Sequence, residues 1–196
     1  NNIMIALYAF VVISFFITIV DIIIRFPLQS EMIDYNDIQA IVINVLALLI
    51  QIVFFAYGFV NAIRGMLSPK RMGAVIVAFF AATCITGTGN MVINSNVQIV
   101  LWWIVLIIPN IVGAVATFAY FVSGKKSKIY SIIIYLAAIC GMFRIIYSNY
   151  NLIVHANQYL SMNSTVRLVL GIAIHCLVIY QTYVLWIKRQ NAIDIS

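Results

Sequence analysis

The sequence predicts an all-α fold: a polytopic membrane bundle of about six transmembrane helices, with both ends of the chain in the cytoplasm. Hydrophobic residues make up 65% of the 196 residues and charged residues only 8%, and the mean hydropathy is +1.10. A soluble domain carries roughly a quarter charged residues. Because so few charged side chains cannot form a water-facing surface, we expect lipid to cover most of this protein.

Six apolar stretches are long enough to cross the hydrocarbon layer, which takes about 20 residues of helix. They are Ile3–Arg25, Ile38–Ile63, Gly73–Asn94, Val97–Ser123, Ile129–Ser148 and Val166–Ile187. Backbone groups in lipid must be satisfied within each segment, and the alternating pattern of a β-barrel is absent, so these stretches are predicted to be helices. Nothing in the composition marks a linker, and residues 1–196 are interpreted as a single domain.

The connections between these stretches contain residues that break helices. Pro27 is expected to end the first span, and Ser68 and Pro69 to open a turn between the second and third. Gly124 is expected to mark the turn after the fourth span. Proline cannot continue a helix and glycine tolerates turn conformations, so each position is typical of a connection.

Lysine and arginine are distributed asymmetrically between the connections. Eight of the eleven basic residues fall in the second connection, the fourth connection and the C-terminal tail, whereas the first connection is acidic, with Glu31, Asp34 and Asp37. The eight are Arg64, Lys70, Arg71, Lys125, Lys126, Lys128, Lys188 and Arg189. Basic connections stay in the cytoplasm, which predicts that both termini are cytoplasmic. Their position between apolar runs also favours a membrane over nucleic acid as the partner, despite a net charge of +6.

Two helix ends share a pattern that suggests a helical-hairpin repeat. The segments Phe55–Val60 (FAYGFV) and Phe118–Val122 (FAYFV) each lead into a basic turn. Repeats of this kind occur in membrane transporters. Aromatic residues followed by basic ones are also common at cytoplasmic membrane interfaces, so the pattern leaves duplication and interfacial anchoring as alternatives.

Polar side chains inside the spans repeat at helical spacing, and most are placed in the outer half of the membrane. On the first span, Ser14 and Thr18 share a helix face with Asp21 and Arg25, which are spaced to pair across one turn. Polar groups are costly in lipid, so their placement indicates where function resides. The candidate ligand-binding residues in this outer half are Asp21, Arg25, Asn44, Asn90, Asn94, Arg144, Ser148 and Arg167.

Two interpretations of these polar stripes are open. In one, they face neighbouring helices and hold the bundle together by interhelical hydrogen bonds, each worth on the order of 0.6 to 2 kcal/mol. In the other, they line a polar cavity open to the exterior. Arg144 favours the cavity, because Asp21, the one acid at similar depth, is spaced to pair with Arg25. An arginine without a counter-ion would bind an anionic group through its planar fork of donors.

Several site classes receive no support from the sequence. Cys84, Cys140 and Cys176 lack the spacing of a metal or redox site, and we expect all three to be small buried hydrophobic side chains. His155 and His175, the only histidines, are placed too far apart in depth for a haem or metal site. We therefore expect no metal, no cofactor and no enzymatic activity.

The leading hypothesis is a multi-pass protein of the cell membrane that binds or transports a small, anionic solute through an outward-facing polar pocket. In size and number of spans the chain is similar to the six-helix substrate-capture subunits of vitamin-uptake transporters, a likeness of architecture that does not fix function. The alternative is a membrane-embedded sensor or accessory subunit that relays a signal or the binding of a partner to a cytoplasmic domain. Beyond the bilayer, a membrane partner subunit or a second copy of the chain are the remaining candidate partners.

Overall fold

The structure, a computed structural model, describes residues 2–29, 35–93, 97–148 and 162–193. Within these residues it contains six long helices and one short π-helix and no strand. They are α1 (Asn2–Gln29), α2 (Tyr35–Ile63), α3 (Pro69–Ile93), α4 (Val97–Thr117), the π-helix η2 (Phe118–Val122), α5 (Lys128–Ser148) and α8 (Met162–Ile193). The predicted all-α helical bundle is confirmed.

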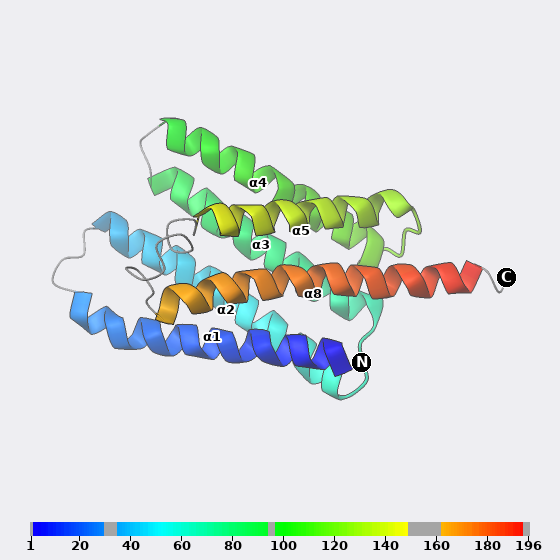
Figure 1. The fold of residues 1–196 in the computed structure, drawn as a ribbon. Helices are drawn as coiled ribbons and strands as arrows, with labels where there is room; N and C mark the ends of the chain where they lie inside the picture. Colours follow the sequence, from blue (N-terminus) through cyan, green and yellow to red (C-terminus); the bar gives the residue numbers. More distant parts are fainter. Residues whose placement is uncertain (1, 30–34, 94–96, 149–161, 194–196) are drawn as a thin grey trace.

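The helices form a closed ring in chain order (Figure 1). Each helix packs against the next one along the chain, and the contact between α8 and α1 closes the ring. Successive helices run in opposite directions, so the α2–α3 and α4–α5 connections lie at the same end of the bundle (Figure 1). The ring is flattened, because α3 also touches α8 across it.

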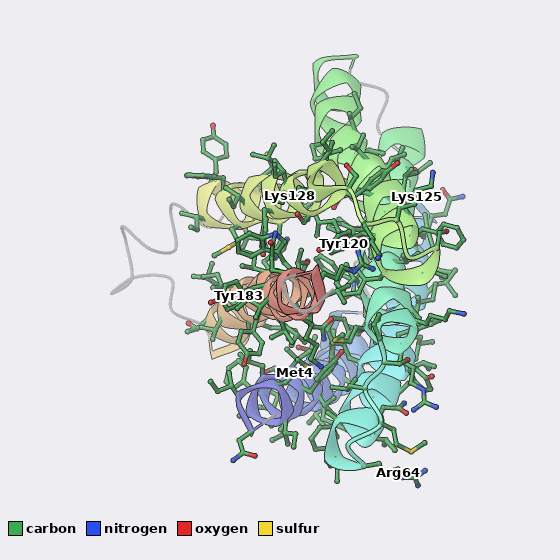
Figure 2. The ribbon with its side chains drawn as sticks, turned by 90° about the vertical axis from the view of Figure 1, so that its right-hand side faces the viewer. Met4, Arg64, Tyr120, Lys125, Lys128 and Tyr183 are labelled. Atoms are coloured by element: carbon green, nitrogen blue, oxygen red, sulfur yellow. The ribbon has the colours of Figure 1, made fainter. Side chains whose placement is uncertain are left out.

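One end of the bundle gathers the N-terminus of α1, the α2–α3 and α4–α5 connections and the C-terminal end of α8 (Figures 1 and 2). We call it the basic end, because these segments carry the eight basic residues that the sequence analysis placed in the cytoplasm. Of these, Arg64, Lys70, Lys125, Lys126, Lys128 and Lys188 are exposed. The folded chain therefore gathers eight of its eleven basic residues at one end, which agrees with the predicted topology.

Apolar surface covers the outside of the ring. Large hydrophobic side chains are exposed on the outer faces of the helices, among them Phe16 at 59%, Val115 at 64% and Phe143 at 69%. Five helices contain an apolar segment long enough to cross a membrane, and the described side chains of α4 together with η2 add the shorter apolar segment Ile107–Val122. A water-soluble monomer rarely exposes apolar surface on this scale, which supports a membrane location.

Helix ends differ from the predicted spans where a local cap decides them. The third helix begins at Pro69 rather than Gly73, because Ser68 accepts a hydrogen bond from the backbone N–H of Arg71 on its Oγ at 3.3 Å. A serine N-cap followed by proline in the first turn is a strong helix start, so the predicted turn at Ser68 and Pro69 is an N-terminus instead. Similarly, α1 does not stop at Pro27 but runs to Gln29.

The end of the fourth span is irregular. After Thr117 the chain winds into η2, where the N–H of Ser123 donates to the carbonyl oxygen of Phe118 at 2.9 Å, five residues back. The chain then turns at Gly124, whose φ of +70° is accessible to glycine at little cost. The matching segment Phe55–Val60 lies within regular α-helix, so the two similar sequences adopt different backbone conformations.

Candidate functional site

Most of the described polar side chains in the bundle interior form their hydrogen bonds with backbone carbonyl oxygens of their own helix. Five hydroxyls donate to the carbonyl oxygen four residues earlier, at 2.7–3.0 Å. They belong to Ser14, Thr18, Thr83, Thr117 and Thr182. All five side chains are buried, so the described members of the first and third stripes, Ser14, Thr18 and Thr83, face inward. Their donors, however, do not join neighbouring helices, which weakens the interpretation of these stripes as interhelical hydrogen-bonded glue.

Two polar side chains do bridge helices near the basic end, and both come from α8. The Nε2 amide of Gln181 donates a hydrogen bond to the phenol oxygen of Tyr8 on α1, in a contact that is fully buried. The guanidinium of Arg189 donates to the carbonyl oxygens of Tyr120 and Lys125, at 2.7 and 2.9 Å. Thus α8 is tied to α1 on one side and to the α4–α5 connection on the other.

Arg144 lies half-buried on α5 and interacts electrostatically with Cys84 on α3 and with His175 on α8. Arg144 therefore lies near the region where α3, α5 and α8 meet. The sequence places no aspartate or glutamate anywhere on α3, α4, α5 or α8. Asp21 belongs to α1, whose neighbours in the ring are α2 and α8. No carboxylate is thus available on the helices that surround Arg144.

His175 is fixed in the centre of this junction. Its Nδ1 lies 2.7 Å from the carbonyl oxygen of Gly171, and since a carbonyl can only accept, the proton resides on Nδ1. The ring meets Phe79 edge-on, with centroids 5.0 Å apart and an interplanar angle of 89°. Its Nε2 lies directly over Gly141 on α5, where a Cβ atom would come within 2.1 Å of it. Only glycine lets α5 and the imidazole approach so closely.

The other candidate residues are placed less completely. Asn44 is exposed on α2, so the structure does not bury it in the interior, and its part in ligand binding stays a prediction. The remaining candidates have side chains outside the described part of the structure: Asp21, Arg25, Asn90, Asn94, Ser148 and Arg167. Whether Asp21 pairs with Arg25, and whether Asn90 and Arg167 approach Arg144, remain predictions.

The described residues form neither a cluster of metal ligands nor a disulfide. No group of three or more histidine, cysteine, aspartate or glutamate side chains gathers there. All three cysteines are free; Cys84 and Cys176 are half-buried, but Cys140 is exposed on the outer face of α5. The prediction of three buried cysteines is therefore wrong for Cys140, because helical spacing alone does not say which apolar face turns to lipid.

Tyr8, Gln181 and Arg189, which form polar contacts between helices, were not predicted as contact residues from the sequence. A signal for Arg189 existed, since its position at a helix end marks a residue able to bind free carbonyl groups. Tyr8 and Gln181 are 173 residues apart, and only the closure of the ring by α1 and α8 brings them together.

The chain matches no family model, and no curated protein or solved structure matches it either. The interpretation of its function therefore depends on the residues and their geometry.

Proposed function

We propose that this chain is a multi-pass protein of the cell membrane that binds a small anionic solute at Arg144, in the outer half of the bundle. The observation that carries the proposal is a half-buried guanidinium at the junction of α3, α5 and α8, none of which contains an acidic residue. A buried charge without a partner is costly. A ligand that brings a negative charge removes that cost on binding, so affinity for an anion follows from the arrangement.

The chemistry of arginine narrows the ligand class. The guanidinium is planar and offers parallel donors that match the two oxygens of a carboxylate or phosphate. The predicted polar residues at similar depth, Asn90 on α3 and Arg167 on α8, belong to the same three helices and would add donors to the remaining oxygens of the ligand. Uptake of the solute, as opposed to its capture, would need an energy-coupling partner, because the sequence contains neither a nucleotide-binding motif nor the paired intramembrane acids that proton-driven carriers use.

The proposal is tested by ligand binding to the purified protein and its variants. Thermal unfolding is first measured with a panel of small carboxylates and with inorganic phosphate, and a dissociation constant is determined for the compound with the largest stabilisation. Arg144→Lys keeps the charge but loses the planar fork, so binding should weaken by about ten-fold or more while the protein still folds. Arg144→Ala should abolish binding. The matched control is Arg64→Ala, which removes an exposed arginine at the basic end and should leave the affinity unchanged.

A second candidate, the sensor or accessory subunit, draws on a different observation. Arg189 couples the C-terminal end of α8 to the α4–α5 connection. A movement of α8 would therefore be passed to this connection at the basic end. If both Arg144 variants lower the unfolding temperature but leave the affinity of the panel compounds unchanged, Arg144 is a structural residue. That outcome would overturn the solute site and favour the sensor.

A further inference from the structure

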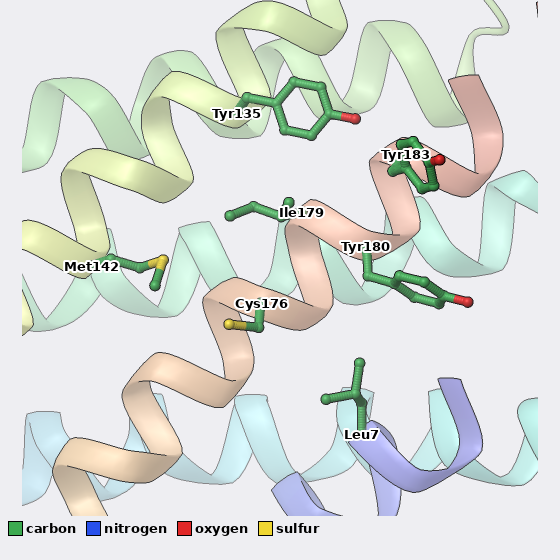
Figure 3. Close-up of a pocket in the computed structure, with 7 residues that line it drawn as sticks. All are labelled: Leu7, Tyr135, Met142, Cys176, Ile179, Tyr180 and Tyr183. Atoms are coloured by element: carbon green, nitrogen blue, oxygen red, sulfur yellow. The ribbon is translucent and has the colours of Figure 1, made fainter. Parts of the chain in front are cut away.

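The outer face of α8 is recessed between its two neighbours in the ring. Its residues Cys176, Ile179 and Tyr180 are only half-buried, but they lie at the bottom of a groove of about 520 Å³. The walls are Leu7 from α1 together with Tyr135 and Met142 from α5, and Tyr183 completes the lining on α8 (Figure 3). None of the candidate solute-binding residues lines this groove, so it is separate from the proposed site at Arg144.

Helix geometry shows that the groove faces lipid and not the core. On α8 the buried residues Ile174, Val178 and Leu185 lie on the opposite side of the helix from the groove residues. The neighbouring outer faces are also apolar and exposed, with Leu136 of α5 at 56% and Ile3 of α1 at 61%. A lipid chain that lies along α8 in this groove would therefore contact α1, α5 and α8 together.

The lining changes in character along the groove. At its deep end are Met142 and Cys176, which lie farther from the basic end than the tyrosines of the lining. Toward the basic end lie three tyrosines, and Figure 3 shows the hydroxyls of Tyr135 and Tyr180 directed toward the C-terminal end of α8. Tyrosine prefers the boundary between hydrocarbon and headgroups, where its ring is apolar and its hydroxyl is wet. The groove thus has a tail end and a headgroup end.

Its length suits one leaflet. Cys176 and Tyr183 are seven residues apart, which is about 10 Å along a helix. One leaflet of the hydrocarbon layer is about 15 Å thick. The groove therefore lies between the middle of the membrane and the headgroup region on the basic side.

Positive charge stands at the headgroup end. Lys128 is exposed at the start of α5 and lies seven residues before Tyr135, which places it on the same helix face one heptad closer to the basic end. Lys125 and Lys126 come directly after the turn at Gly124, just before Lys128 in the sequence, and both are also exposed. A lipid with a negatively charged headgroup could therefore place its acyl chain in the apolar groove and its phosphate beside Lys128.

From this arrangement we propose that the groove formed by α1, α5 and α8 binds an anionic phospholipid of the cytoplasmic leaflet, with an acyl chain along Ile179 and the phosphate at Lys128. The tyrosine hydroxyls offer hydrogen bonds to the glycerol and ester oxygens between chain and phosphate. Bound in this way, the lipid would fill the recess that separates α1 from α5. The proposal does not depend on the solute site, which lies nearer the other end of the bundle.

Native mass spectrometry of the full chain tests the proposal. Delipidated protein is titrated with dioleoyl phosphatidylglycerol and with dioleoyl phosphatidylcholine, which share the same chains and differ in net charge. We expect phosphatidylglycerol to bind more tightly by about five-fold or more, the factor that corresponds to about 1 kcal/mol for one lysine near a charged headgroup. Glycerol 3-phosphate, which has the phosphate but no chains, should not compete.

Variants separate the two halves of the site. Ile179→Trp fills the groove and should reduce the affinity for both lipids by at least five-fold, which corresponds to a loss of about 1 kcal/mol of chain contact. Lys128→Gln should remove the preference for phosphatidylglycerol and leave phosphatidylcholine binding unchanged. The controls are Leu136→Trp, on the exposed outer face of α5, and Lys70→Gln, at the basic end of α3 away from the groove. Should Ile179→Trp fail to fold, Leu7→Trp fills the groove from the opposite wall.

Three results would overturn the proposal. Equal binding of both lipids to the unaltered protein would show that the groove does not recognise the charge of the headgroup. An equal effect of Lys70→Gln and Lys128→Gln would show that the basic end attracts anionic lipid without a specific position. A dimer that Ile179→Trp converts to monomer would identify a second copy of the chain as the occupant of the groove.

Discussion

The guanidinium of Arg189 stacks on the ring of Tyr120, with its central carbon 4.1 Å from the ring centroid, while it donates a hydrogen bond to the carbonyl oxygen of the same residue. Tyr120 lies in η2, at the end of the fourth span, where the last carbonyl groups of a helix have no partner in the helix itself. The backbone N–H of Lys125 donates its hydrogen bond to the carbonyl oxygen of Ala119 rather than to that of Tyr120. Arg189 therefore supplies both a missing donor and a positive charge at the negative end of a helix dipole.

Removal of this guanidinium should loosen the basic end of the bundle. We expect Arg189→Gln to destabilise the protein by about 1–3 kcal/mol, because it removes two charge-assisted hydrogen bonds and a cation–π contact. Lys188→Gln, at the adjacent exposed position, is the matched control and should have little effect. Thermal unfolding in detergent measures the difference. Equal unfolding temperatures for the two variants would mean that the Arg189 contacts contribute nothing to stability.

Tyr8 and Gln181 offer a test of buried hydrogen bonding between α1 and α8. Tyr8→Phe removes the acceptor of the Gln181 amide and leaves a buried polar group unsatisfied, which should cost about 1–3 kcal/mol. Within the described residues the Oε1 of Gln181 already has no partner. The double variant Tyr8→Phe with Gln181→Leu removes every polar group at this contact, so it should recover stability relative to Tyr8→Phe alone. Additive losses in the double-mutant cycle would show that the two side chains are not coupled.

The positions of the helices along the sequence were predictable because a membrane span depends on little more than apolar length. Their ends were predicted less well. At Ser68 and Pro69 the same two residues are typical of a turn and of a helix start, and only the hydrogen bond from Arg71 to the serine decides between them. The inward direction of Ser14, Thr18 and Thr83 followed from helical spacing, whereas the partner of each hydroxyl did not.

Contacts across the ring could not be predicted from spacing. Asn44 has the same heptad relation to Gln51 that Asn110 has to Thr117, yet Asn44 is exposed and Asn110 and Thr117 are buried. The difference arises from which face of each helix meets its neighbours, and that depends on the packing of all six spans. The groove beside Ile179 likewise depends on how α8 packs between α1 and α5, which the local sequence does not indicate.

The topology is testable with single cysteines in a protein whose three native cysteines have been replaced by alanine. Cysteines at Ser68 and Ser127, in the two basic connections, should be shielded from an impermeant thiol reagent in intact cells and labelled once the membrane is permeabilised. Cysteines at Ser30 and Asn157, in the first and fifth connections of the sequence, should be labelled from outside. Labelling of Ser127→Cys in sealed cells would contradict the orientation derived from the positive charges.

The contact between Gly141 and His175 makes a prediction about how closely α5 and α8 must approach. In an open helix, Gly→Ala is stabilising by about 1 kcal/mol. At Gly141 the new Cβ would lie 2.1 Å from Nε2 and 2.7 Å from Cδ2 of His175. The ring cannot swing aside easily, because Gly171 holds its Nδ1 and Phe79 abuts it edge-on. Gly141→Ala should therefore destabilise the protein by about 1–3 kcal/mol, the usual cost of overpacking a core.

Gly171 on α8 provides the matched control for this substitution. A Cβ there would lie 2.7 Å from Cδ1 of Ile145, which is the far end of a flexible side chain and can rotate away. Gly171→Ala should accordingly cost less than Gly141→Ala when unfolding temperatures are compared in the same detergent. Combining Gly141→Ala with His175→Ala removes the obstacle, so the pair should lose less stability than the sum of the two single variants. Strict additivity would show that α5 and α8 do not meet at this pair, and it would also separate His175 from the junction to which Arg144 is assigned.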